Sequence, residues 1–237
     1  MSFSFIAAVG NYDVTSGTVL DASASLNVAA GDVLVAVCSH QTEGNTSFAV
    51  AKDAGSPPNT FVFDAADTIH HSNLDMHSAI GYLLSAAADA TATFRLTLGV
   101  AKIARSIIVL QFRPDTSEVV TKDASNVAEG TGTAPASGNI TTTGTDEIAV
   151  GGCVSYNLLA TSSEQINSVA ATEPVGSPQT TTSAWYRLLT ATFANGQASA
   201  TLGSGDWTCH IIAIKSEAGG PPLLGPSLRT VRSALRW

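Results

Sequence analysis

Residues 70–77, with the sequence HHSNLDMH, hold three imidazoles and one carboxylate. On one side of an extended loop, His71, Asp75 and His77 would offer the nitrogen and oxygen ligands that a zinc-like ion takes. Their spacing differs from the His-Glu-x-x-His pattern of helical zinc sites, so solvent-exposed loop histidines are the interpretation we favour. A pH-sensitive contact is a third alternative, because histidine changes charge near neutral pH. We therefore assign no metal site and expect no cofactor.

The cysteines Cys38, Cys153 and Cys209 form no close pair in the sequence, which indicates neither a disulfide framework nor a CxxC zinc site. Cys38 and Cys153 stand in apolar stretches and are predicted to be buried small side chains. Cys209 precedes His210, but adjacent residues of a strand point to opposite faces, which disfavours a thiol–imidazole pair. We expect His210 to be a packed or edge residue rather than a general base, with exposure on a strand as the default.

Three aromatic residues, Trp185, Tyr186 and Trp207, are candidates for a sugar-stacking platform. Trp185 and Tyr186 match Ile80 and Gly81 in a repeated block of sequence, which instead predicts that at least one of them belongs to the core.

No GxSxG, P-loop or GxGxxG motif and no regular acidic calcium repeat occurs in the sequence, and its carboxylates are scattered. We expect a protein without catalytic residues. A hydrolase would need convergent carboxylates or a Ser/His pair in a cleft.

Residues 219–237 differ from the rest of the chain in composition. They begin with a Gly/Pro-rich stretch, and all 19 acidic residues precede them. Three arginines stand at near-helical spacing, so a short amphipathic helix is expected that forms only when docked. The candidate partner-binding residues of this arm are Leu223, Leu224, Leu228, Arg229, Val231, Arg232, Leu235, Arg236 and Trp237. Three alternatives stay open for the arm: it folds back onto its own acidic body, clasps a neighbouring protein, or contacts packaged DNA.

Four blocks of sequence recur in the same order. Residues 32–38 match 147–153, 78–84 match 183–189, 97–99 match 201–203, and 106–110 match 210–214. The first copy carries about ten additional residues within 39–77.

The segments in both copies are short, rich in Val, Ile and Thr, and bounded by turn-forming residues, which predicts strands. Segments 33–38, 107–112, 148–154 and 210–214 are almost continuously apolar and are expected to be buried on both faces, whereas 91–98 alternates. We predict an all-β fold of two internally repeated antiparallel β-sandwich units, jelly-roll-like and in tight contact, plus an extended C-terminal arm. The alternative is one larger sandwich that the two copies share.

The expected division of the chain is a first repeat at 1–115, a connection at 116–143, a second repeat at 144–218 and the arm at 219–237. The connection is rich in Thr, Gly and Ser and is expected to be a linker or an exposed strand.

Charged residues make up only 13% of the chain, about half of the roughly 25% usual in soluble proteins. The net charge of −8 argues against general nucleic-acid binding. No stretch approaches the length of a membrane span, so no membrane association is expected. The N-terminus does not resemble a secretion signal, and synthesis in a reducing cytoplasm is expected.

Four features follow one another along the chain. They are an Ala-Gly-Asp turn at 30–32 before an apolar strand, an Ile-Ile-Val type strand at 106–112, a Thr/Ser/Gly spacer, and a second copy. This order resembles a family of two-repeat β-sandwich proteins of tailed bacteriophages, prophages and some bacterial surface proteins, over residues 18–217. The resemblance implies a virion structural or surface-attachment module rather than an enzyme.

We therefore expect a capsid decoration or cement protein that is located in the virion and assembled in the host cytoplasm. Its expected partner is the major capsid protein or another virion protein, and a homo-oligomer is expected. The alternative is a receptor- or glycan-binding module at a tail tip or fibre, with the aromatic residues and segment 39–77 as its contact surface.

Overall fold

The computed structural model describes residues 3–41, 47–52, 59–71, 75–115, 118–155, 161–174 and 182–218. The first half of the chain contains β1 (Phe3–Asp13), β2 (Gly17–Asp21), β3 (Leu26–Val28), β4 (Val33–Gln41), β5 (Phe48–Lys52), the short 3₁₀ helix η1 (Ala65–Asp67), β6 (Thr68–His70), β7 (Met76–Leu83), β8 (Asp89–Ala92) and β9 (Phe94–Pro114). The second half contains β10 (Glu118–Gly132), β11 (Glu147–Ser155), β12 (Ser162–Ile166), β13 (Val169–Ala170), β14 (Thr182–Leu189), β15 (Ala198–Thr201) and β16 (Gly205–Ala218). The predicted all-β class is confirmed.

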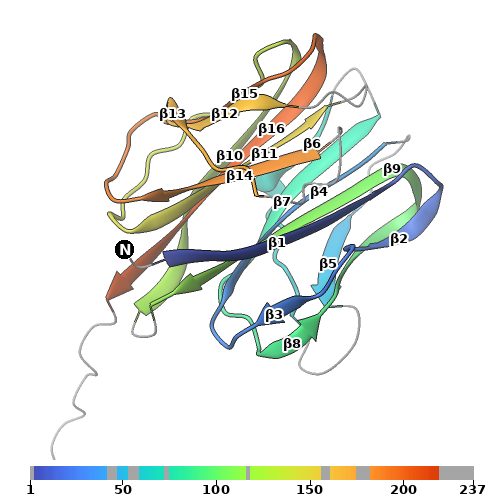
Figure 1. The fold of residues 1–237 in the computed structure, drawn as a ribbon. Helices are drawn as coiled ribbons and strands as arrows, with labels where there is room; N and C mark the ends of the chain where they lie inside the picture. The colour runs from blue at the N-terminus through green and yellow to red at the C-terminus, as the bar shows by residue number, and fades with distance from the viewer. Residues whose placement is uncertain are drawn as a thin grey trace, which may run out of the picture.

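The strands form layers that stack on one another (Figure 1). A central sheet with the order β1-β9-β4-β7-β6 faces a second central sheet with the order β10-β16-β11-β14. On its outer side, the first is covered by β2, β5, the N-terminal part of β9 and the β3–β8 pair. The second is covered by β13-β12-β15.

The strand order of the first central sheet recurs in the second, with β1, β9, β4 and β7 replaced by β10, β16, β11 and β14. Cys38 on β4 lies opposite Ala79 and Ile107, and Cys153 on β11 lies opposite Ser183 and Cys209. Three of the four pairs of repeated blocks therefore lie in corresponding strands: 32–38 with 147–153, 78–84 with 183–189, and 106–110 with 210–214. The jelly-roll description and the proposed domain boundaries stay predictions.

The strand register corrects the match of 78–84 with 183–189 by one residue. Trp185 lies opposite Gly151 on β11, and Gly81 lies opposite Ala36 at the corresponding place on β4. Trp185 thus corresponds to Gly81 and not, as the blocks indicate, to Ile80. A shift of one residue along a strand moves a side chain to the other face of the sheet. Ile80 accordingly packs between the two central sheets, whereas Trp185 packs in the outer core of the second half.

Three hydrophobic cores fill the spaces between the layers. One lies within the first half and one within the second. The third lies between the two central sheets and combines Val35, Val37 and Ile108 of the first half with Val150 and Ile212 of the second. The central strands contribute alternate residues to an outer core and to this middle core, which confirms the prediction of strands buried on both faces.

Residues 116–143 contain a long paired strand. From Glu118 to Gly132 the chain forms β10, which pairs along its length with β16 as β1 pairs with β9. The sequence predicted either a linker or an exposed strand for this segment, and its described part contains a strand. Segment 91–98 alternates between buried and more exposed residues as predicted, although it is divided between β8 and β9. Within the described ranges, no helix has the length and apolar character needed to cross a membrane.

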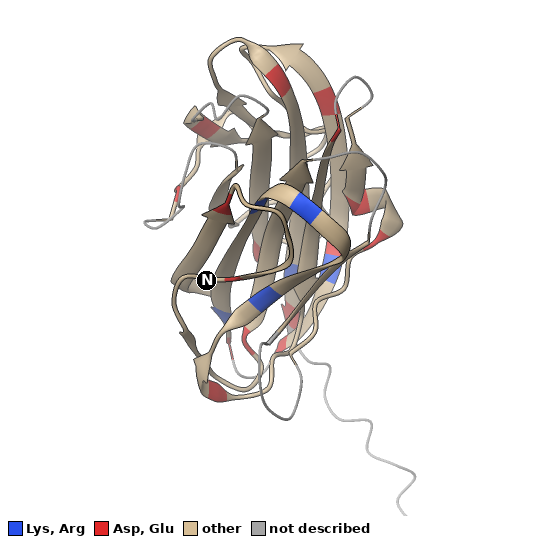
Figure 2. Cartoon of the chain, turned by 90° about the vertical axis from the view of Figure 1, so that its right-hand side faces the viewer, with Lys and Arg blue, Asp and Glu red and all other residues tan. Residues whose placement is uncertain are grey.

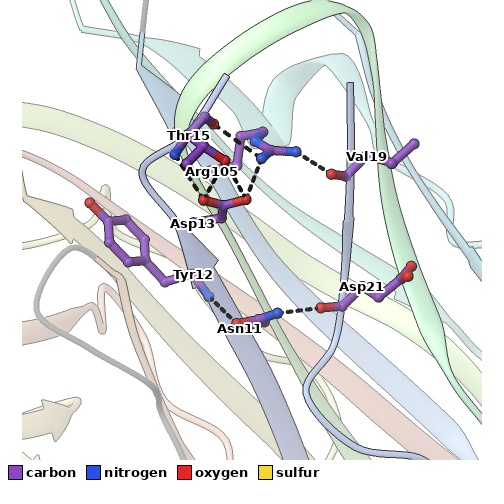
Figure 3. A network of polar contacts seen from close by, with 7 residues as sticks. All are labelled: Asn11, Tyr12, Asp13, Thr15, Val19, Asp21 and Arg105. Atoms are coloured by element: carbon purple, nitrogen blue, oxygen red, sulfur yellow. Dashed lines mark hydrogen bonds and ion pairs between the residues drawn. The ribbon is translucent and has the colours of Figure 1, made fainter. Parts of the chain in front are cut away.

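The long strand β9 passes from the outer layer to the central sheet near Ala104, whose φ of 46° is in the left-handed region. Directly after this bend, the buried guanidinium of Arg105 donates hydrogen bonds to the carbonyls of Val19 and Thr15 and forms an ion pair of 2.6 Å with Asp13 (Figure 3). These bonds fasten the β1–β2 connection to the bend of β9.

Candidate functional site

The three aromatic candidates do not form a platform on the surface. Trp185 is fully buried, and its indole nitrogen donates to the carbonyl of Gln165. Trp207 is 9% exposed and packs in the same outer core of the second half. Tyr186, on the other face of β14, stacks on Phe5 with a centroid separation of 4.5 Å. The prediction that at least one of Trp185 and Tyr186 belongs to the core is confirmed. The sugar-stacking platform is wrong because burial removes the indole faces from any ligand.

All three cysteines are free and buried, which confirms the predicted burial of Cys38 and Cys153. Burial raises the pKa of the Cys38 thiol. Cys209 lies in the outer core of the second half, while His210 points to the opposite face of β16. The exposure expected for His210 is wrong: its side chain is completely buried between the two central sheets, where strand pairing places an inward-facing residue.

A layer of hydroxyl groups continues the middle core toward one end. Ser78 of β7 lies 2.6 Å from Thr208 and 2.7 Å from Nε2 of His210, both on β16. Ser39 of β4 lies 2.9 Å from Thr182 of β14. These bonds join the halves by polar contacts where the hydrophobic core ends.

The Ser78–His210 pair has the atom types of a nucleophile and its base, but its surroundings differ from those of a catalytic pair. Both residues are 0% exposed. Burial lowers the pKa of His210 to about 3, and no described residue hydrogen-bonds its Nδ1. The pair therefore acts as a contact between the halves.

His71, Asp75 and His77, which the sequence offers as candidate metal ligands, do not come together. His71 is buried, turns toward the second half, and has its Nε2 3.3 Å from the carbonyl of Gly130. His77 belongs to a different cluster, described below. Within the described ranges, no group of three or more His, Cys, Asp or Glu side chains is placed to hold a metal ion. The expectation of exposed loop histidines is also wrong for His71 and His77, because both are packed against neighbouring strands.

His77 is the middle member of a row of three histidines that crosses three strands. It lies opposite His40 on β4 and opposite His70 on β6. Its ring stacks on that of His70 at 4.1 Å between centroids and on that of His40 at 4.8 Å. His40 in turn contacts Phe48 of β5, with 5.2 Å between centroids. We call His40, His77 and His70 the histidine row.

The histidine row runs from the interior to the surface. His40 and His77 are 0% exposed, whereas the side chain of His70 is 47% exposed and lies 3.9 Å from Asp75. Neither ring nitrogen of His77 forms a hydrogen bond within the described residues. Burial lowers the pKa of His40 to about 3, and the nearby His77 and Lys102 add to this effect. A hydrogen bond with the backbone of Gln41 raises the pKa but does not outweigh them.

Sequence reasoning found His70 and His77 but missed His40. Thirty or more residues separate His40 from the other two, so local spacing holds no sign of their contact. The antiparallel register of β4 and β7 is the signal that brings them together.

A shallow groove opens beside the outer part of the row. Its volume is about 520 Å³, and it is lined by Ser47, Phe48, Phe63, Ala65, Thr68, His70 and His77. The groove lies within segment 39–77, which the sequence marked as the part of the first copy with additional residues.

A buried acid stands at the same place in both halves, at the start of β4 and of β11. Asp32 accepts a hydrogen bond from the amide of Ala29, and Glu147 accepts one from the amide of Gly144, three residues earlier in each case. Asp32 also forms an ion pair with Arg113. In each half, the carboxylate therefore closes the turn that leads into the strand.

The two acids differ in their neighbours. Hydrogen bonds to Asp32, chiefly from Arg113, outweigh the effect of burial and lower its pKa. Burial raises the pKa of Glu147 to about 7, and the neighbouring carboxylate of Asp123 adds to this. The Asp123 carboxylate itself is held by the backbone amide and hydroxyl of Thr143.

The partner-binding residues predicted in the arm, at 223–237, lie outside the described residues. Figure 2 shows Asp and Glu spread over both ends and the edges of the body, among few Lys and Arg. No protein-family model matches the chain, and no curated protein matches it either.

Proposed function

We propose that this chain is a non-enzymatic structural protein of a tailed bacteriophage particle, and that it decorates the assembled capsid shell. The observation that carries the proposal is the middle core: the two central sheets pack face to face, so both halves form one filled body. Ser78, His210 and the cysteines serve contacts inside that body. Such a body suits a spacer or clamp on a larger assembly.

Charge supports a role for the arm in attachment. Residues 1–218 hold all 19 acidic residues and 8 of the 11 basic residues, a net charge of −11, whereas 219–237 carry three arginines and no acid. An acidic body with a basic arm of Leu, Arg and Trp fits a partner whose surface is acidic and partly apolar. Binding only to the assembled shell would stabilise that shell by mass action.

The test is the copy number of this chain in purified virus particles, measured by quantitative mass spectrometry against the major shell protein. Decoration predicts a number in a fixed ratio to the shell protein. Deletion of 219–237 should abolish particle association while the circular dichroism of the body is unchanged. Absence of the chain from particles would refute the proposal.

A receptor- or glycan-binding module at the tail is the second candidate, and one observation favours it. The groove beside His70 and His77 is lined by the partly buried ring of Phe63 together with Ser47 and Thr68, which are side chains suited to a sugar. This candidate predicts a few copies per particle and normal attachment after deletion of the arm. Glycan binding that survives a Phe63→Ala change would exclude the groove.

A further inference from the structure

The histidine row joins an edge strand to the rest of the molecule. The strand β6 has only three residues, and within the described sheets it pairs with β7 alone. Its C-terminal residue, His70, stacks on His77, which stacks on His40. The C-terminal end of β6 is thus held by ring contacts in addition to backbone pairing.

The N-terminal end of β6 is fastened differently. The preceding η1 residue Asp67 and nearby Asp64 both accept hydrogen bonds of 2.6 Å from Lys122 of β10. These ion pairs connect the segment to the second half. The two ends of the segment therefore depend on different chemistry, since the histidine end consists of imidazoles, whose ordinary pKa in water lies near neutral pH.

The charged and titratable groups that face the row disfavour its protonation on balance. Lys102 of β9 is buried and lowers the pKa of both His40 and His77. His77 also lowers the pKa of His40, and His70 lowers the pKa of both. From β5, the described side chain that contacts the row is the uncharged ring of Phe48. Asp75 acts in the opposite sense on His77. His71 faces away, toward Glu129 and Asp206 of the second half.

We propose that the histidine row is an acid-sensitive latch, which holds β6 and the adjoining end of β7 closed at neutral pH and releases them on acidification. Protons enter more readily when the row is open, because water then solvates the imidazolium ions that the closed interior excludes. The pKa of His40 and His77 in the closed state, about 3 and about 4, agrees with this direction. Opening is local, since β4 remains paired with β9.

Hydrogen exchange of the full chain, followed by mass spectrometry at pH 7 and pH 5, tests the latch. After correction for the intrinsic exchange rate, protection of residues 64–71 and 75–83 should fall about 20-fold for each of the two buried histidines that gains a proton in the open form. Protection of β11 and β16 should change much less. Unchanged protection of 64–83, or an equal loss over the whole chain, would overturn the proposal.

A His77→Phe variant keeps a stacking ring and removes the proton site. Between pH 7 and pH 5, the factor by which its protection falls should be about 20-fold smaller than the factor for the wild type. The matched control is His71→Gln, which changes a histidine of the same segment outside the row and should keep the full pH dependence. If His77→Phe behaves as the wild type does, the row is not the latch. If it fails to fold, His40→Phe removes the other buried proton site, and its loss of protection should likewise be about 20-fold smaller than that of the wild type.

Discussion

Gly152 of β11 lies against Val37 of β4 across the middle core, and a Cβ at Gly152 would come within 2.9 Å of both γ-carbons of Val37. The two central sheets therefore approach closely here because Gly152 has no side chain. The face-to-face packing of the halves depends on this contact, since a β-branched neighbour in a filled core has little room to move.

Gly152→Ala should lower the free energy of unfolding by about 1–3 kcal/mol through overpacking. Urea denaturation followed by tryptophan fluorescence measures the loss. In a Val37→Ala background, the same change should cost clearly less, because the clashing γ-carbons are gone. Equal costs in both backgrounds would show that Gly152 and Val37 are not in direct contact.

Ser78→Ala should destabilise the protein by about 1–3 kcal/mol, because the change leaves the buried Nε2 of His210 without its hydroxyl partner. The hydroxyl of Thr208 loses the same partner. Chemical denaturation at pH 7 measures the effect. Ser4→Ala, which changes an exposed hydroxyl on β1, is the control and should stay within about 0.5 kcal/mol of the wild type. A cost for Ser78→Ala as small as that of the control would contradict this role.

Lys122→Met should lower the free energy of unfolding by about 1–3 kcal/mol, a value between those of surface and buried ion pairs. The reason is that the carboxylate of Asp67, which has no exposed surface, loses its cation. Adding Asp67→Asn should recover part of the loss because it removes the unpaired charge. Thermal denaturation of the single and double variants tests this, and a double variant less stable than Lys122→Met would refute the argument.

The buried carboxyl group of Glu147 should make the free energy of unfolding depend on pH. Burial raises its folded-state pKa from the ordinary 4.5 to about 7. A raised carboxyl pKa contributes stability that is fully present below pH 4.5 and is lost as the pH rises through 7. Glu147→Gln cannot ionise, so its stability relative to the wild type should increase between pH 5 and pH 8. Unfolding free energies of both proteins at these two pH values test the sign, and a relative decrease would contradict it.

The sequence by itself determined the class of the fold and the double burial of the central strands. Segments such as 33–38 and 148–154 are almost continuously apolar, and a strand covered on both faces buries all of their side chains. The burial of Cys38 and Cys153 followed from the same pattern. These features are local, because each residue's type and its neighbours along the chain specify them.

Only the tertiary structure decided which residues meet. His40 and His77 come from distant parts of the chain and stack because β4 and β7 pair in one register. Trp185 faces an outer core because that register differs by one residue from the match of the repeated blocks. The alternation of a strand marks two faces but does not say which core each face meets, and sheet packing settles that choice through contacts between distant residues.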